Sequence, residues 1–70
     1  MPYDEMIVYS GHIGGMVFAS KATGRCCIFI DEDATGEEAK DTIQWAHETL
    51  ESGKLESLSA VDFAKILGQW

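Results

Sequence analysis

The run from Arg25 to Asp31 holds five apolar residues in a row, with a charged residue at each end. Such a run predicts a β-strand over Cys26–Ile30 that is buried on both faces. Met6–Ser10 and Met16–Lys21 are rich in strand-forming residues and predict two further strands. The two connections between these segments are short, and the first is dense in glycine. We therefore predict an antiparallel meander with Met16–Lys21 as its middle strand.

The alternation along the predicted strands leaves neither face of the sheet polar. In the first strand, Met6 and Val8 fall on one side, and Ile7 and Tyr9 on the other. The other two strands divide in the same way, with apolar residues on both sides. A sheet with one face in water should alternate between apolar and polar residues, so both faces of this sheet need a cover.

Two helices are predicted after the sheet. Thr35 and Glu38 fit a capping box at the start of the first helix, and Gly53 fits its end. Ser59 fits the cap of the second helix. The apolar stripe of the first helix consists of Ala39, Ile43, Ala46 and Leu50, and that of the second consists of Phe63, Ile66, Leu67 and Trp70.

The predicted fold class is α+β, a three-stranded antiparallel β-meander followed by two α-helices (βββαα), in a single domain over residues 1–70. The first helix covers one face of the sheet. The second face is covered either by the second helix or by another copy of the protein. We therefore expect a homo-oligomer, most simply a dimer formed face to face or through the edge of the Cys26–Ile30 strand.

Size and charge narrow the classes of function. Seventy residues leave no room for two lobes with a cleft between them. Twelve acidic residues against five basic ones give a formal net charge of −7. This charge argues against direct binding to nucleic acid or to an anionic membrane, and it permits binding to a basic protein surface.

The cysteines and the N-terminus predict a compartment. Cys26 and Cys27 are adjacent on a predicted strand, so their side chains point to opposite faces, and a bond between them would be strained. We expect two reduced, buried thiols in a reducing compartment. The first residues show no basic segment followed by an apolar run, so no signal peptide is expected. The predicted location is cytoplasmic, in the host cytoplasm if the protein is viral.

An acidic turn, Asp31-Glu32-Asp33, follows the most apolar strand. The apolar run leading into Asp-x-Asp-x-Thr resembles the first motif of the haloacid-dehalogenase phosphatases. The resemblance implies a nucleophile at Asp31, an acid/base at Asp33 and a Mg²⁺ cofactor. That family also uses a parallel sheet, a downstream lysine and a further acidic pair, which this short chain has little sequence left to supply.

The same turn resembles the first half of an EF-hand loop, with Asp31, Asp33, Thr35 and Gly36 at the first ligand positions and at the glycine. The position of the bidentate glutamate is Thr42, and a strand precedes the loop in place of a helix. The preferred interpretation is a solvated acidic turn that also favours the start of the helix. We predict no metal and no cofactor.

A second candidate site is the glycine-rich connection, which contains Gly11, His12, Ile13 and Gly14. A loop that binds phosphate normally leads into a helix, and this one leads into a strand, so a flexible hairpin tip is the preferred interpretation. If the loop binds a ligand, His12 and Ile13 would contact it. The two histidines and two cysteines match no spacing of zinc ligands.

Trp45 is the third candidate. It lies about 160° from the apolar stripe of the first helix. The acidic residues Glu38, Asp41 and Glu48 flank it. Two interpretations stay open: an exposed anchor for a partner, with a charged surround, or a side chain covered by the second helix.

The function expected from these observations is that of a small, acidic, non-enzymatic interaction protein. It would inhibit or regulate a partner by occupying a basic, nucleic-acid-binding surface, through Trp45 and its acidic neighbours together with the turn at residues 31–33. Its general profile is similar to that of phage and mobile-element proteins that act against host defence. One alternative is an oligomer that binds or sequesters a small ligand or nucleotide through the glycine-rich loop. Another is a metal-dependent enzyme or enzyme subunit that uses Asp31 and Asp33.

Overall fold

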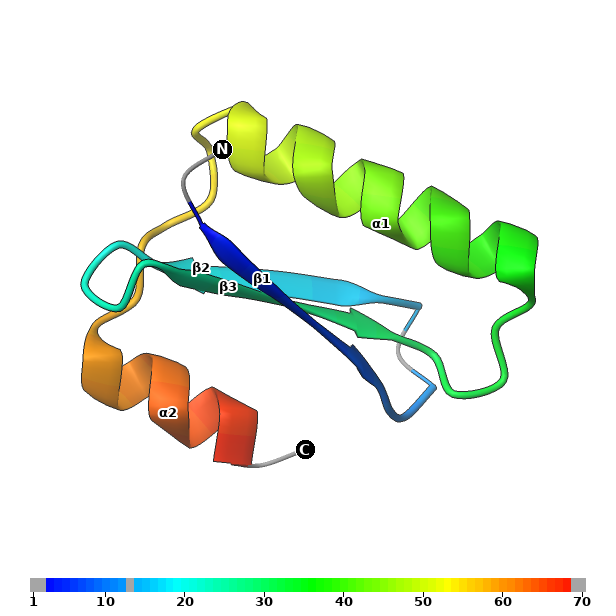
Figure 1. The fold of residues 1–70 in the computed structure, drawn as a ribbon, viewed down its shortest axis with the longest axis horizontal. Helices are drawn as coiled ribbons and strands as arrows, with labels where there is room; N and C mark the ends of the chain where they lie inside the picture. The colour runs from blue at the N-terminus through cyan, green and yellow to red at the C-terminus, as the bar shows by residue number, and fades with distance from the viewer. Residues whose placement is uncertain (1–2, 13, 69–70) are drawn as a thin grey trace.

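The computed structural model describes residues 3–12 and 14–68. Within them, three strands precede two helices: β1 (Asp4–Tyr9), β2 (Met16–Ser20), β3 (Arg25–Ile30), α1 (Gly36–Glu51) and α2 (Ala60–Gly68). The sheet lies between the helices, with α1 on one face and α2 on the other (Figure 1). The predicted α+β class and βββαα order are confirmed.

The predicted strand arrangement is wrong. The order in the sheet is β1-β3-β2, so β3 lies in the middle. It pairs in parallel with β1 and antiparallel with β2. Residues 26–30 of β3 are all buried. The central position protects both edges of this strand, and the helices cover its two faces. Asp4 and Glu5 of β1 stay exposed, which suits an edge strand.

The connection from β1 to β2 crosses the end of β3. It is therefore not the tip of a hairpin, because β1 and β2 do not pair with each other. Gly15 closes this connection with a φ of +97°, and a Cβ there would lie 2.8 Å from the Thr42 Cγ2. Glycine is thus required for the backbone conformation and for the close approach to α1.

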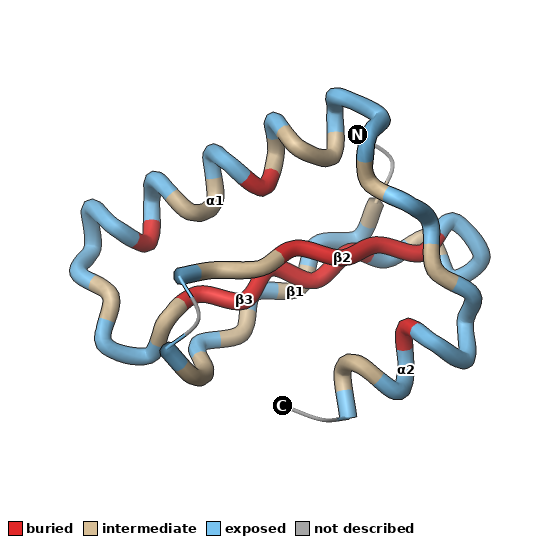
Figure 2. The backbone as a smooth tube through the Cα atoms, turned by 180° about the vertical axis from the view of Figure 1, so that it is seen from behind, coloured by how far each residue is buried: buried red, intermediate tan, exposed pale blue. Residues whose placement is uncertain are grey.

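Each face of the sheet has its own apolar cluster, and the buried residues lie mainly on β2 and β3 (Figure 2). Under α1 the buried members are Val17, Ile28, Ile30, Ala39 and Ala46. Under α2 they are Phe18, Cys27, Phe29 and Phe63. The Phe18 ring centroid lies 5.5 Å from that of Phe29 and 5.0 Å from that of Phe63, so α2 is held on the sheet by three aromatic rings.

The helix boundaries follow the predicted signals. Thr35 caps α1, and both hydrogen bonds of its capping box with Glu38 are present. Gly53 follows the C-cap of α1 with a φ of +71°. At the start of α2, the Asp62 backbone N–H donates to the Ser59 Oγ at 3.1 Å. Trp70, assigned to the stripe of the second helix, lies outside the described residues.

The two edges of the sheet differ. The linker between the helices runs along the outer edge of β2, where the Leu58 N–H donates to the Ala19 carbonyl at 2.9 Å and the Lys21 N–H to the Ser57 Oγ at 3.0 Å. On β1, Ile7 is 40% exposed and Tyr9 is 58% exposed.

Neither of the two routes to a dimer that the sequence suggested is available, because α2 covers the second face and β3 is not an edge strand.

Replacing Phe63 with alanine should release α2 from the sheet. We expect Phe63→Ala to lower the free energy of unfolding by about 3–5 kcal/mol, since it removes a buried ring and leaves a cavity. Val61→Ala is the matched control, because Val61 lies on the same helix and is 63% exposed. Urea unfolding followed by circular dichroism measures both. Equal stability of the two variants would show that α2 does not contribute to the core.

Candidate functional site

The fold brings together two segments that the sequence suggested as separate sites. The glycine-rich connection follows β1, and the acidic turn follows β3. Because β1 and β3 are parallel, both segments leave the sheet at the carboxyl ends of these strands, beside the start of α1. In open sheets with parallel strands, the carboxyl ends of the strands are the usual place for a ligand.

The contacts here fasten one segment to the other. The Gly14 N–H donates to the two carboxylate oxygens of Asp31, at 3.0 and 3.2 Å. The Glu32 N–H donates to the Gly11 carbonyl at 3.1 Å. His12 adds two side-chain contacts, Nδ1 to the Asp33 Oδ1 at 3.2 Å and Nε2 to the Glu32 Oε1 at 3.5 Å.

These contacts support a structural role for the acidic turn. A hollow of about 300 Å³ lies beside it, lined by Gly14, Asp31, Asp33, Ala34, Glu38 and Thr42. The described lining has three acidic residues and no basic one, so it disfavours a phosphate. In the described part of the chain, no three His, Cys, Asp or Glu side chains are grouped so that they could hold a metal ion. Ile13, expected to contact a ligand at this loop, lies outside the described residues.

The cysteines are free and buried in β3. Burial, with a smaller contribution from Cys26, raises the pKa of Cys27 from 9.0 to about 11. Burial and the nearby charge of Glu5 also raise the pKa of Cys26, against a lowering by a hydrogen bond with the Met6 backbone. Both thiols therefore stay protonated at neutral pH, which disfavours a nucleophile. The ring of His47 contacts the Glu5 carboxylate, which links α1 to β1.

Trp45 is 46% exposed on α1. α2 lies across the sheet from this helix, so the interpretation that the second helix covers Trp45 is wrong (Figure 1). Asp41 and Glu48 are four residues before and three after Trp45, which makes them its neighbours on the helix surface.

The three acidic neighbours of Trp45 differ in their engagement. Glu38 accepts a hydrogen bond from the Thr35 N–H at 2.9 Å, so its carboxylate is turned towards the cap. Glu48 accepts one from the Gln44 side chain at 3.1 Å. All three residues are exposed. Asp41 and Glu48 lie within about one turn of Trp45, so they form the nearest acidic part of this surface.

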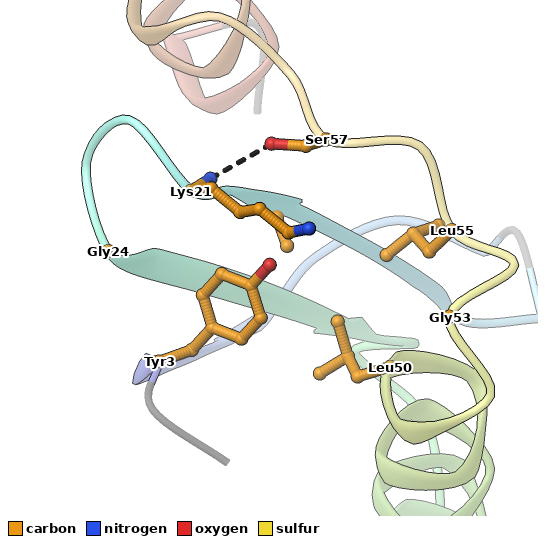
Figure 3. Close-up of a pocket in the computed structure, with 8 residues that line it drawn as sticks. Tyr3, Lys21, Gly24, Leu50, Gly53, Leu55 and Ser57 are labelled. Carbon is orange, nitrogen blue, oxygen red and sulfur yellow. Dashed lines mark hydrogen bonds between the residues drawn. The ribbon is translucent and has the colours of Figure 1, made fainter.

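A pocket that the sequence did not indicate lies where α1 ends. Its volume is about 450 Å³, and its described lining residues are Tyr3, Ala19, Lys21, Gly24, Leu50, Gly53, Leu55 and Ser57 (Figure 3). They come from the residue before β1, the end of β2, the β2–β3 turn, the last turn of α1 and the linker to α2. Only the presence of Lys21 beside the sheet was visible in the sequence, because the pocket depends on the path of the linker.

Comparison with known proteins adds no assignment. No protein-family model, curated protein or solved structure gives a significant match to the chain. Among the described residues, neither helix has the length and apolar character that a membrane span requires.

The link between the acidic turn and the glycine-rich loop can be tested by removing Asp31. We expect Asp31→Ala to lower the free energy of unfolding by about 1–3 kcal/mol, because the Gly14 N–H loses a charged acceptor. Asp41→Ala is the control, since it removes an exposed carboxylate from α1. Chemical denaturation of both variants measures the difference. If Asp31→Ala is as stable as Asp41→Ala, the turn does not hold the loop.

Proposed function

We propose that this chain is a non-enzymatic interaction protein that binds a basic surface of a partner protein through the outer side of α1. The observation that carries the proposal is the exposed indole of Trp45 between the exposed carboxylates of Asp41 and Glu48. An apolar anchor surrounded by charge is the usual composition of a binding hot spot and its rim. A net charge of −7 would also speed the encounter with a basic partner.

The charge distribution of α1 supports this proposal. The helix carries five acidic residues, Glu37, Glu38, Asp41, Glu48 and Glu51, and one lysine. Glu48 and Glu51 lie near the C-terminal end, and the last turn has no basic residue. Acidic residues at that end oppose the helix dipole, at a cost of about 0.3–1 kcal/mol each. The placement of Glu48 and Glu51 therefore lowers the stability of the helix. Binding to a basic partner surface would explain why acidic residues stand at this end.

We propose that the basic surface of the partner is one that binds nucleic acid, because such surfaces carry clustered Lys and Arg. Asp31, Glu32 and Asp33, in the turn that precedes α1, would extend the contact. In this proposal the protein acts in the cytoplasm, or in a host cytoplasm if it is viral, by competing with nucleic acid for its partner. The free thiols of Cys26 and Cys27 suit that reducing compartment.

A homodimer is also part of the proposal, and it would form through the open edge of β1. Antiparallel pairing of two β1 strands centred on Ile7 would set Ile7 against the partner's Ile7. The same register would set Tyr9 opposite the partner's Glu5, so no like charges face each other. At the other sheet edge the linker already bonds to Ala19 and Lys21, so β1 is the route that we propose.

Trp45 should dominate the affinity for the partner. The chain is used to capture proteins from a lysate of its source or host, and the captured protein is identified by mass spectrometry and purified. We then expect Trp45→Ala to weaken its binding by about 2 kcal/mol or more, roughly thirtyfold. Val61→Ala, an exposed apolar residue on α2, should bind as the wild type does. Melting curves of both variants should match the wild type.

Charge is tested by Glu48→Lys against Glu56→Lys, which change the net charge equally. Because both changes reduce the long-range attraction equally, Glu48→Lys should slow association and flatten its salt dependence more than Glu56→Lys does. A nucleic-acid ligand of the partner should compete with the chain. Wild-type affinity of Trp45→Ala, or equal effects of the two lysine variants, would contradict the proposal.

The dimer can be tested separately. Size-exclusion chromatography with light scattering should show a dimer for the wild type at high concentration and a monomer for Ile7→Lys, because a lysine on an edge strand opposes pairing. Val61→Lys is the control and should remain dimeric. A wild type that stays monomeric at millimolar concentration would refute this part.

A further inference from the structure

The pocket beside Lys21 has the composition of a small-molecule site. Its volume of about 450 Å³ falls within the range of about 300–1,000 Å³ that is typical of ligand pockets. Most of its described wall is apolar, contributed by the ring of Tyr3 and the side chains of Ala19, Leu50 and Leu55. An apolar wall with a few polar groups selects a ligand that is itself mainly apolar.

Lys21 provides the only charge among the described lining residues. The chain has twelve acidic and five basic residues, so a lining with one base and no acid differs in sign from the molecule as a whole. Lys21 forms no salt bridge with a carboxylate of the described residues. Its side chain and the Tyr3 hydroxyl extend into the same space, towards Leu50 and Leu55 (Figure 3).

The walls of the pocket are tied together. The Lys21 N–H donates to the Ser57 Oγ at 3.0 Å, which fixes the linker to the β2–β3 turn. Gly24 of that turn accepts a hydrogen bond from the Asp4 N–H at 2.8 Å, which fixes the start of β1 beside Tyr3. The site is therefore formed before a ligand enters, which reduces the ordering cost of binding.

We propose that this pocket binds a small molecule with an apolar body and a single carboxylate. The carboxylate lies at the Lys21 ammonium and the Tyr3 hydroxyl, and the apolar body lies against Leu50 and Leu55. The end of α1 near Gly53 carries the negative pole of the helix dipole, so the carboxylate is kept at the Lys21 side. One ammonium in a chain of net charge −7 matches one negative charge and disfavours a phosphate. This inference does not depend on the proposed partner of α1.

Octanoate is the probe, with neutral octanamide as its matched control. Each is titrated into the full chain at neutral pH, and the backbone amide signals are followed by NMR. We expect saturable shifts at lining residues such as Ala19, Lys21, Gly24 and Leu55 with octanoate. Octanamide should shift the same signals with several-fold lower affinity, because it lacks the charge.

Lys21→Met keeps an unbranched apolar stem of similar shape and removes the charged ammonium. We expect it to weaken octanoate binding about three- to tenfold and to leave octanamide binding unchanged. Lys40→Met removes an exposed lysine from α1 and should bind octanoate as the wild type does. The amide spectrum of each variant reports directly whether it is folded.

Several results would overturn the inference. In the titration, these results are the absence of saturable amide shifts, or amide shifts centred on Ile7 and Tyr9 in place of the pocket. In the affinity comparison, they are equal affinity for octanoate and octanamide, or an affinity of Lys21→Met for octanoate that equals that of the wild type. None of them bears on Trp45, because the outer side of α1 and this pocket share no residue.

Discussion

The burial of β3 is the constraint on which the rest of the structure depends. Five successive apolar residues, Cys26–Ile30, point alternately to both faces of the sheet, so one covering layer cannot remove them from water. The chain meets this demand with a strand on each side and a helix on each face. At about 25 cal/mol per Å² of apolar surface, the burial of such a strand is among the largest favourable terms in a domain of this size. This arrangement leaves the edge of β1 and the outer side of α1 exposed to water.

The sequence was informative wherever a local signal determines a local structure. Thr35, Gly53 and Ser59 marked the helix ends, and the alternation along each strand indicated that both faces need cover. The order of the strands depends on competition between distant segments, and here the short connections were misleading. The comparison that would have resolved it is between β1, which begins with Asp4 and Glu5, and β3, which has no charge between its ends. The most apolar strand, β3, takes the centre of the sheet, although β2 lies between β1 and β3 in the sequence.

The candidate sites show the same division. Nothing local predicts that Asp31 meets Gly14, because their contact follows from the parallel pairing of β1 with β3. The exposure of Trp45 depends on which face α2 covers, and one helix can cover only one face. The pocket beside Lys21 depends on the path of the linker along β2. Each of these features is a property of the topology, so residue types and spacing alone could not decide them.

The parallel register of β1 has a consequence for the order in which the sheet can assemble. β2 and β3 are joined by a tight turn and can pair early, whereas Asp4 meets Arg25, twenty-one positions further along the chain. Closing that larger loop costs more entropy, so we expect β1 to join the sheet after β2 and β3 have paired. Until it does, one edge of the most apolar strand is open to any other chain. When β1 joins the sheet it covers this edge of β3, and it thereby protects the chain against misassembly during synthesis.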